Sequence, residues 1–100
     1  ATATRVGLTR AELAAITGSG VRAVQNWAAG NATPRPEAAR RLLDVSTITG
    51  LLCDTYTDEG IGIWLRNRNA RLDLHRPIDL LTEGRIDEVI EQARWVAGAW

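Results

Sequence analysis

The stretch that decides the fold runs from Leu13 to Gly30 and reads LAAITGSGVRAVQNWAAG. An alanine-rich amphipathic segment leads into Gly18-Ser19-Gly20, and the segment that follows places Val21, Val24 and Trp27 on one side of a second helix. Glycine adopts a positive φ at little cost, so Gly18 permits a tight corner. Two short helices joined by such a turn cross at a steep angle. The stretch therefore predicts a helix-turn-helix.

The side of the second helix opposite the packing residues predicts contacts to DNA. In a helix-turn-helix the start of this helix lies in the major groove. Arginine and amide side chains there bind base edges or phosphates, and N–H groups at the helix start hold a phosphate. Another small pair of helices, with polar residues exposed by default, remains the alternative. The candidate DNA-binding residues are Ser19, Val21, Arg22, Gln25 and Asn26.

Composition limits the other possibilities. A chain of 100 residues with 45% hydrophobic residues suffices for one domain, or for two small helical units that share a core. No apolar run approaches the roughly 18 residues that cross a bilayer, and the start does not resemble a signal segment. Cys53 is the single cysteine, which excludes an internal disulfide and a thiolate zinc site, and we expect it to be buried. These features favour a reducing cytoplasm.

The net charge of zero hides an asymmetry between the two halves of the chain. Residues 1–45 hold six arginines and three acids, a net charge of +3, whereas residues 46–100 hold six arginines and nine acids, a net charge of −3. A basic half suits a polyanion and an acidic half suits a protein partner. Chance variation in surface charge is the alternative explanation.

Helix signals continue along the whole chain, and no strand-like alternation of useful length occurs. Thr9 and Glu12 form a capping-box pattern, and Pro36 fits the first turn of a later helix. Because the segment from Val45 to Gly50 is rich in β-branched residues and ends in glycine, we expect a kink or break there. The sequence predicts an all-α fold. The expected helices cover about residues 9–17, 21–28, 36–52, 58–65, 77–81 and 86–96, with an irregular loop over residues 67–76.

Nothing in the sequence supports an enzyme. Asp87, Glu88 and Glu91 have the spacing of a solvated helix face, and His75 has no motif around it. A catalytic triad order, a glycine-rich phosphate loop and a zinc-binding HExxH motif are all missing. We therefore expect no catalytic residues, no metal and no cofactor.

A second informative stretch, Ile63–Val89, reads IWLRNRNARLDLHRPIDLLTEGRIDEV. Trp64 and Leu65 are expected to point into a core, with Leu72 packing back against it. Following a helix-turn-helix, the pattern resembles the toxin-binding domain of the Xre/MbcA/ParS antitoxin family over about residues 9–96. Arg68 replaces a frequent proline and Asp73-Leu74 a frequent glycine pair. The residues that carry the resemblance are Trp64-Leu65, Asn69, Leu72, Pro77-Ile78-Asp79-Leu80-Leu81 and Glu83-Gly84-Arg85.

The resemblance implies an antitoxin that neutralises a RES-domain toxin, a class that consumes NAD, while binding no NAD itself. It also implies binding to operator DNA and repression of its own operon, usually as a homodimer or within a larger toxin–antitoxin complex. On this basis residues 1–45 are expected to form an Xre-like DNA-binding unit and residues 46–100 the toxin-binding unit. The alternatives are a stand-alone regulator whose C-terminal helices dimerise, and a protein-binding module that no longer contacts DNA.

Candidate toxin-binding residues come from two places. The segment after Trp64-Leu65 displays polar side chains, and the C-terminus combines indoles with a guanidinium, the residue types that dominate interface energetics. The alternative is that Trp95 and Trp100 fold back onto the core of this chain, because a small domain needs its aromatic area. The candidates are Arg66, Asn67, Arg68, Asn69, Arg94, Trp95 and Trp100.

Overall fold

Helices make up nearly all the regular structure in the part of the chain that the structure describes. A computed structural model describes residues 6–98, and within that range it contains no β-strand, only one isolated bridge between Asn69 and His75. The all-α prediction is confirmed. The elements are α2 (Arg10–Thr17), α3 (Val21–Ala29), α4 (Pro36–Leu52), α5 (Asp58–Arg66), the 3-10 helix η1 (Ala70–Leu72), α6 (Pro77–Thr82) and α7 (Ile86–Ala97).

The helix-turn-helix forms as its capping residues predict. The Thr9 hydroxyl accepts a hydrogen bond from the Glu12 N–H at 3.0 Å, and the Glu12 carboxylate accepts one from the Thr9 N–H at 2.8 Å, so the capping box is complete. Gly18, with φ of 70°, ends α2 in the left-handed region. Gly30, with φ of 78°, ends α3 in the same way.

α4 is continuous from Pro36 to Leu52, so the expected kink or break near Val45–Gly50 is wrong. Val45, Ile48 and Leu52 bury one face of the helix, and the Thr49 hydroxyl donates a hydrogen bond to the Ser46 carbonyl at 3.0 Å. Burial of this face outweighs the weak helix propensity of the β-branched residues and Gly50.

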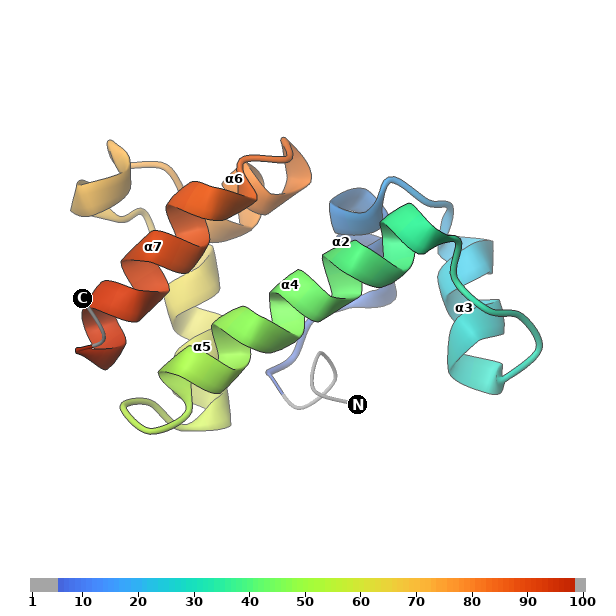
Figure 1. Cartoon of the computed structure of the whole chain (residues 1–100), viewed down its shortest axis with the longest axis horizontal. Coiled ribbons are helices and arrows are strands. Elements are labelled where there is room, and N and C mark those ends of the chain that lie inside the picture. Colours follow the sequence, from blue (N-terminus) through green and yellow to red (C-terminus); the bar gives the residue numbers. More distant parts are fainter. Residues whose placement is uncertain (1–5, 99–100) are drawn as a thin grey trace.

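α4 also organises the arrangement of the other helices. It runs along the long axis of the molecule, with α3 at one end and with α5 and α7 around the other (Figure 1). It packs against α2 and α7, while α6 contacts α2, α5 and α7. The expected boundary between residues 45 and 46 therefore falls inside a helix that contacts both predicted units. The division into two units stays a prediction.

One core joins α2, α4, α5, η1, α6 and α7. Leu72 is buried, as expected of the residue that packs the loop back, and Leu65 is buried beside a half-buried Trp64. Cys53 corrects an expectation: it lies at the C-cap of α4 and is exposed, and its thiol donates a hydrogen bond to the Gly50 carbonyl at 3.1 Å instead of entering the core. No described helix is long and apolar enough to cross a membrane. The largest fully buried side chains are Ile48, Leu52, Ile61, Leu65, Leu80, Leu81, Val89 and Pro77.

Candidate functional site

The first candidate surface is the exposed side of α3. Val21 is 43% exposed, and Arg22 and Gln25 are exposed, whereas Ser19 and Asn26 are half-buried. Gly20 is the N-cap and offers no side-chain hydrogen bond, so no side chain caps the N–H groups at the start of α3. Arg22 forms no ion pair with any of residues 6–98. The predicted residues thus share one end of the helix-turn-helix, with polar groups available to a ligand.

Arg35 was missed in the sequence reasoning and belongs to this end of the molecule. It is exposed at the N-cap of α4 and lines, with Thr17, Gly18 and Ser19, a depression of about 420 Å³. Its position just before a proline-initiated helix was the signal that could have identified it. The depression therefore presents a guanidinium beside the turn between α2 and α3.

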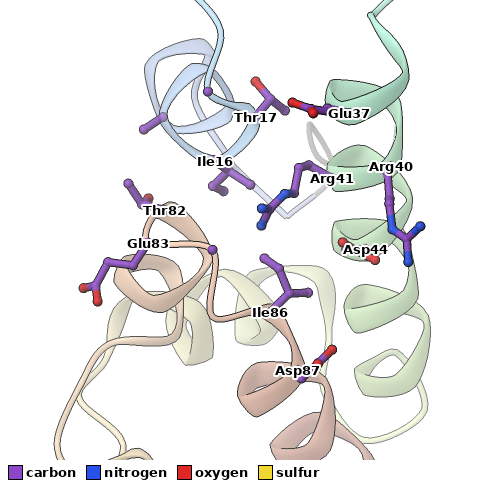
Figure 2. A pocket seen from close by; sticks show the side chains of 13 residues that line it. Ile16, Thr17, Glu37, Arg40, Arg41, Asp44, Thr82, Glu83, Ile86 and Asp87 are labelled. Atoms are coloured by element: carbon purple, nitrogen blue, oxygen red, sulfur yellow. The ribbon is translucent and has the colours of Figure 1, made fainter.

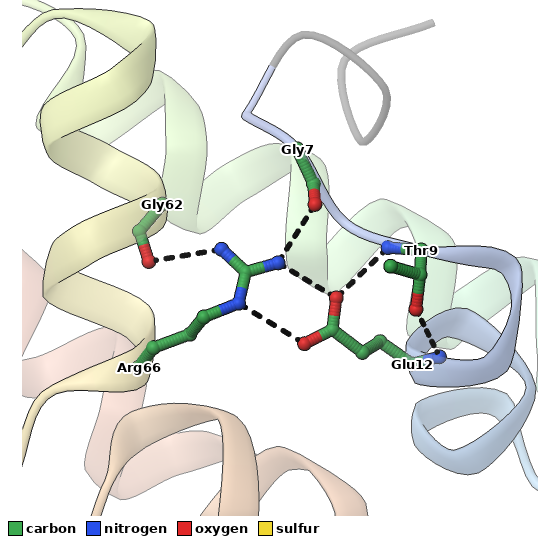
Figure 3. A network of polar contacts seen from close by, with 5 residues as sticks. All are labelled: Gly7, Thr9, Glu12, Gly62 and Arg66. Carbon is green, nitrogen blue, oxygen red and sulfur yellow. Dashed lines mark hydrogen bonds and ion pairs between the residues drawn. The ribbon is translucent and has the colours of Figure 1, made fainter.

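Arg66, predicted to contact a toxin, lies in a network that joins two helices. Its guanidinium binds both oxygens of the Glu12 carboxylate, with Nε to Oε2 at 3.1 Å and Nη2 to Oε1 at 2.7 Å (Figure 3). It also donates to the carbonyl oxygens of Gly7 at 2.7 Å and Gly62 at 3.3 Å. This side chain holds α5 against α2 and the segment that precedes α2.

The same Glu12 carboxylate is electrostatically perturbed. Partial burial by itself raises the pKa of Glu12, but the hydrogen bonds from Arg66 and Thr9 and the attraction of the Arg66 charge outweigh it, so the pKa is lowered overall. The carboxylate therefore favours its charged form in the folded chain.

The loop after α5 places its candidates in different roles. Asn67 is exposed, and Arg68 is exposed while donating to the Leu74 carbonyl at 3.2 Å. Asn69 is half-buried, and its side-chain oxygen accepts a hydrogen bond from the Arg71 N–H at 2.9 Å, which caps η1. Asn67 and Arg68 thus face solvent, whereas Asn69 fixes the loop.

Two residues of this loop adopt backbone conformations that favour glycine. Asp73 has φ of 53° and Leu74 has φ of 64°, both in the left-handed region. In the antitoxin family that this segment resembles, a glycine pair is frequent at these two positions. The loop keeps a glycine-like backbone there without the glycines.

The C-terminal candidates lie on α7. Arg94 and Trp95 are exposed, and Trp95 retains 45% of its accessible surface instead of joining the core. The Arg71 guanidinium lies over the Trp95 ring, with its central carbon 3.5 Å from the ring centre. Trp100 lies outside the described residues. Arg71 was not among the candidates, because only the fold brings η1 against α7.

Ion pairs hold the starts of the last two helices. Arg76 binds both carboxylate oxygens of Asp79 at 2.8 Å, and Arg85 binds those of Glu88 at 2.6 and 2.8 Å. The hydrogen bonds from these arginines lower the pKa of Asp79 and the pKa of Glu88. Among residues 6–98, no group of three His, Cys, Asp or Glu side chains is arranged to hold a metal ion.

A depression of about 630 Å³ separates α2, α4 and the turn between α6 and α7. Figure 2 shows Arg41 directed toward the space near Ile16 and Ile86, and its Nη1 is buried without a hydrogen-bond partner. The acids on its lining outnumber its two arginines, Arg40 and Arg41, so the depression does not favour an anion. The acids are Glu37, Asp44, Glu83 and Asp87.

Comparison with known proteins then places the chain in a class. It is 37% identical over 95 residues to the probable mycobacterial cidal antitoxin Rv3188 of Mycobacterium tuberculosis, covering 94% of this chain and 81% of that protein. The mycobacterial cidal antitoxin MbcA of M. tuberculosis is 27% identical over 86 residues, covering 86% of this chain and 76% of MbcA. No family model matches the chain.

A solved structure extends the likeness to the fold. The M. tuberculosis MbcT-MbcA toxin-antitoxin complex contains a chain that matches with a TM-score of 0.82 and 25% identity, covering 97% of this chain and 87% of that one. The fold and the relatives define the class of protein as an antitoxin of a toxin–antitoxin system. The chain belongs to the family of mycobacterial cidal antitoxins that includes MbcA.

Proposed function

We propose that this chain binds and neutralises a RES-domain toxin that degrades NAD, and that it represses its own operon through the helix-turn-helix. The observation that carries the proposal is the match of 97% of this chain to a protein solved in a toxin–antitoxin complex. The toxin class and its NAD chemistry follow from the resemblance of the segment that begins at Trp64-Leu65. The proposal assigns this chain no catalytic group and no cofactor, and it includes a homodimer within the larger complex.

The toxin-binding surface combines the loop after α5 with the C-terminal turns of α7. Its contact residues are four exposed side chains, those of Asn67, Arg68, Arg94 and Trp95. A partly exposed indole with arginine nearby is the composition expected of an interface hot spot. Trp100, outside the described residues, is included on residue type alone.

Two of the candidates act on this surface from inside the chain. The Arg66 guanidinium is held by Glu12, and the Asn69 amide caps η1. We assign both a positioning role, since each fixes the element from which a neighbouring contact residue projects.

The operator-binding surface is the exposed side of α3 together with the turn before it. In this assignment Val21 faces the floor of the major groove, and Ser19 faces a phosphate. Base edges and flanking phosphates are contacted by Arg22, Gln25 and Asn26. The uncapped start of α3 and the nearby Arg35 support this assignment by supplying further phosphate donors.

Co-expression with the product of the gene that neighbours the gene for this chain tests the toxin half of the proposal. A stable complex with an enzyme-sized partner, together with rescue of growth, is the expected result. A chain that purifies alone and fails to rescue growth favours the stand-alone regulator.

Binding to operator DNA at increasing salt tests the repressor half. The logarithm of the affinity should fall with the logarithm of salt by about −0.9 per phosphate contact, and Arg22→Ala should flatten the slope. Absence of binding to its own promoter at low salt, with or without toxin, contradicts the repressor half and favours a protein-binding module.

A further inference from the structure

We propose that Arg71, stacked on Trp95, is a recognition residue that binds a carboxylate on the surface of the toxin. The inference deepens the proposed toxin binding and rests on it. It adds to that surface a residue whose importance only the folded chain reveals, because η1 packs against α7.

The stack fixes the side chain of Arg71 in a defined place. Its guanidinium carbon lies 3.5 Å from the centre of the Trp95 ring, and both residues remain exposed. A guanidinium stacks on an aromatic face through its own face, which leaves its N–H donors directed outward in the plane of the group. The edge of Arg71 is therefore available to a planar acceptor, and a carboxylate has the matching geometry.

The backbone that carries Arg71 is fixed as well. The Asn69 side chain accepts a hydrogen bond from the Arg71 N–H, and Leu72, the next residue, is buried in the core. A side chain held in its bound position before association loses less conformational entropy when it binds. Arg71 thus has the preorganisation that distinguishes a specific contact from an ordinary surface charge.

Arg71, like Arg68 and Arg94, has no carboxylate partner among residues 6–98. Arg66, Arg76 and Arg85 each bind a carboxylate of this chain. Within residues 6–98 the Arg71 side chain forms no ion pair and no hydrogen bond, only the contact with Trp95. Its charge is left for a group outside the described chain.

The surrounding charge favours a protein over a nucleic acid as the source of that group. Residues 46–100 carry nine acids against six arginines, and Asp87, Glu88 and Glu91 lie on the same helix as Trp95. A nucleic acid brings a row of phosphates that these acids repel. A protein places one carboxylate on Arg71 and basic or neutral groups opposite Glu91, so both charges are satisfied.

The test is the Kd for the proposed toxin partner, measured with the wild-type chain and with three variants. Arg71→Ala should raise Kd by roughly 10- to 100-fold and flatten its salt dependence. Arg71→Lys should lose most of the same affinity, because lysine keeps the charge but lacks the planar edge. Arg40→Ala is the matched control, since Arg40 is an exposed arginine on α4, and its Kd should stay within about twofold.

The outcomes separate this inference from the proposed function. A wild-type chain that does not bind the toxin overturns both. Wild-type binding with an unchanged Kd for Arg71→Ala overturns the role of Arg71 alone, and so does a Kd increase fully explained by a smaller folded fraction in circular dichroism. Weakened operator binding with unchanged toxin binding overturns the inference in favour of a phosphate contact.

Discussion

Arg66 binds both oxygens of the Glu12 carboxylate, and one of those oxygens also accepts the Thr9 N–H that completes the cap of α2. Glu12 and Arg66 are 54 positions apart in the chain. One carboxylate therefore caps the first helix of the helix-turn-helix and holds α5, the helix that precedes the proposed toxin-binding loop. The two proposed functions share this structural contact.

Glu12→Gln should lower the free energy of unfolding by about 1 kcal/mol, because the ion pair is partly exposed and one charge-assisted hydrogen bond is weakened. Chemical denaturation measures the change. Glu91→Gln is the control, since Glu91 is an exposed acid on α7, and its effect should stay within about 0.5 kcal/mol. Equal effects of the two substitutions would contradict a structural role for the Arg66–Glu12 pair.

The same pair should make stability depend on acid. Because the pKa of Glu12 is lowered below its ordinary value of 4.5, its ionised form stabilises the folded chain above that pH. This contribution is lost as the pH falls through the lowered pKa of the folded state. The difference in unfolding free energy between wild type and Glu12→Gln should therefore shrink between pH 6 and pH 3. A difference that stays constant over this range contradicts the pKa shift.

Gly62→Ala should destabilise the chain by about 1–3 kcal/mol, because the added Cβ would lie 2.5 Å from the carbonyl oxygen of Val6. That contact forces the segment before α2 away from α5. Gly50→Ala is the matched control within α4, where a Cβ meets nothing within 4 Å, and it should stabilise by about 0.5–1 kcal/mol. Thermal and chemical unfolding of both variants check the opposite signs, and destabilisation by both would refute the assigned contact.

Leu74→Gly should stabilise the loop by about 0.5–1 kcal/mol. The substitution removes the cost of holding a leucine in the left-handed region, about 1–2 kcal/mol. Glycine offsets part of this gain, because it loses more backbone entropy on folding than leucine does. Leu43→Gly is the control, because Leu43 is 68% exposed but helical, and it should destabilise by about 1 kcal/mol. A loss of stability in both variants would show that the Leu74 side chain matters more than its backbone.

Local signals made much of the fold predictable. Thr9 and Glu12 indicated the start of α2, Gly18 and Gly30 the ends of α2 and α3, and Pro36 the start of α4. Each of these residues acts on backbone groups within a few positions of itself, so the sequence alone contains the cause.

The features that could not be predicted from the sequence depend on packing between residues far apart in the chain. Continuity of α4 through Gly50 depends on burial against distant helices, and the exposure of Cys53 depends on where that helix ends. Arg22 is exposed, as expected of an arginine, whereas Ser19 is half-buried and Trp95 is exposed although it is a large aromatic residue. The partners of Arg66 and Arg71 could not be predicted, because Glu12 and Trp95 reach them only in the folded chain.

The most direct test of the central claim is NAD consumption by the proposed RES-domain toxin, measured while this chain is titrated into the reaction. The account predicts that NAD loss stops at a fixed molar ratio, and that Trp95→Ala needs a large excess to reach the same inhibition. Continued NAD loss in the presence of excess folded wild-type chain would contradict it.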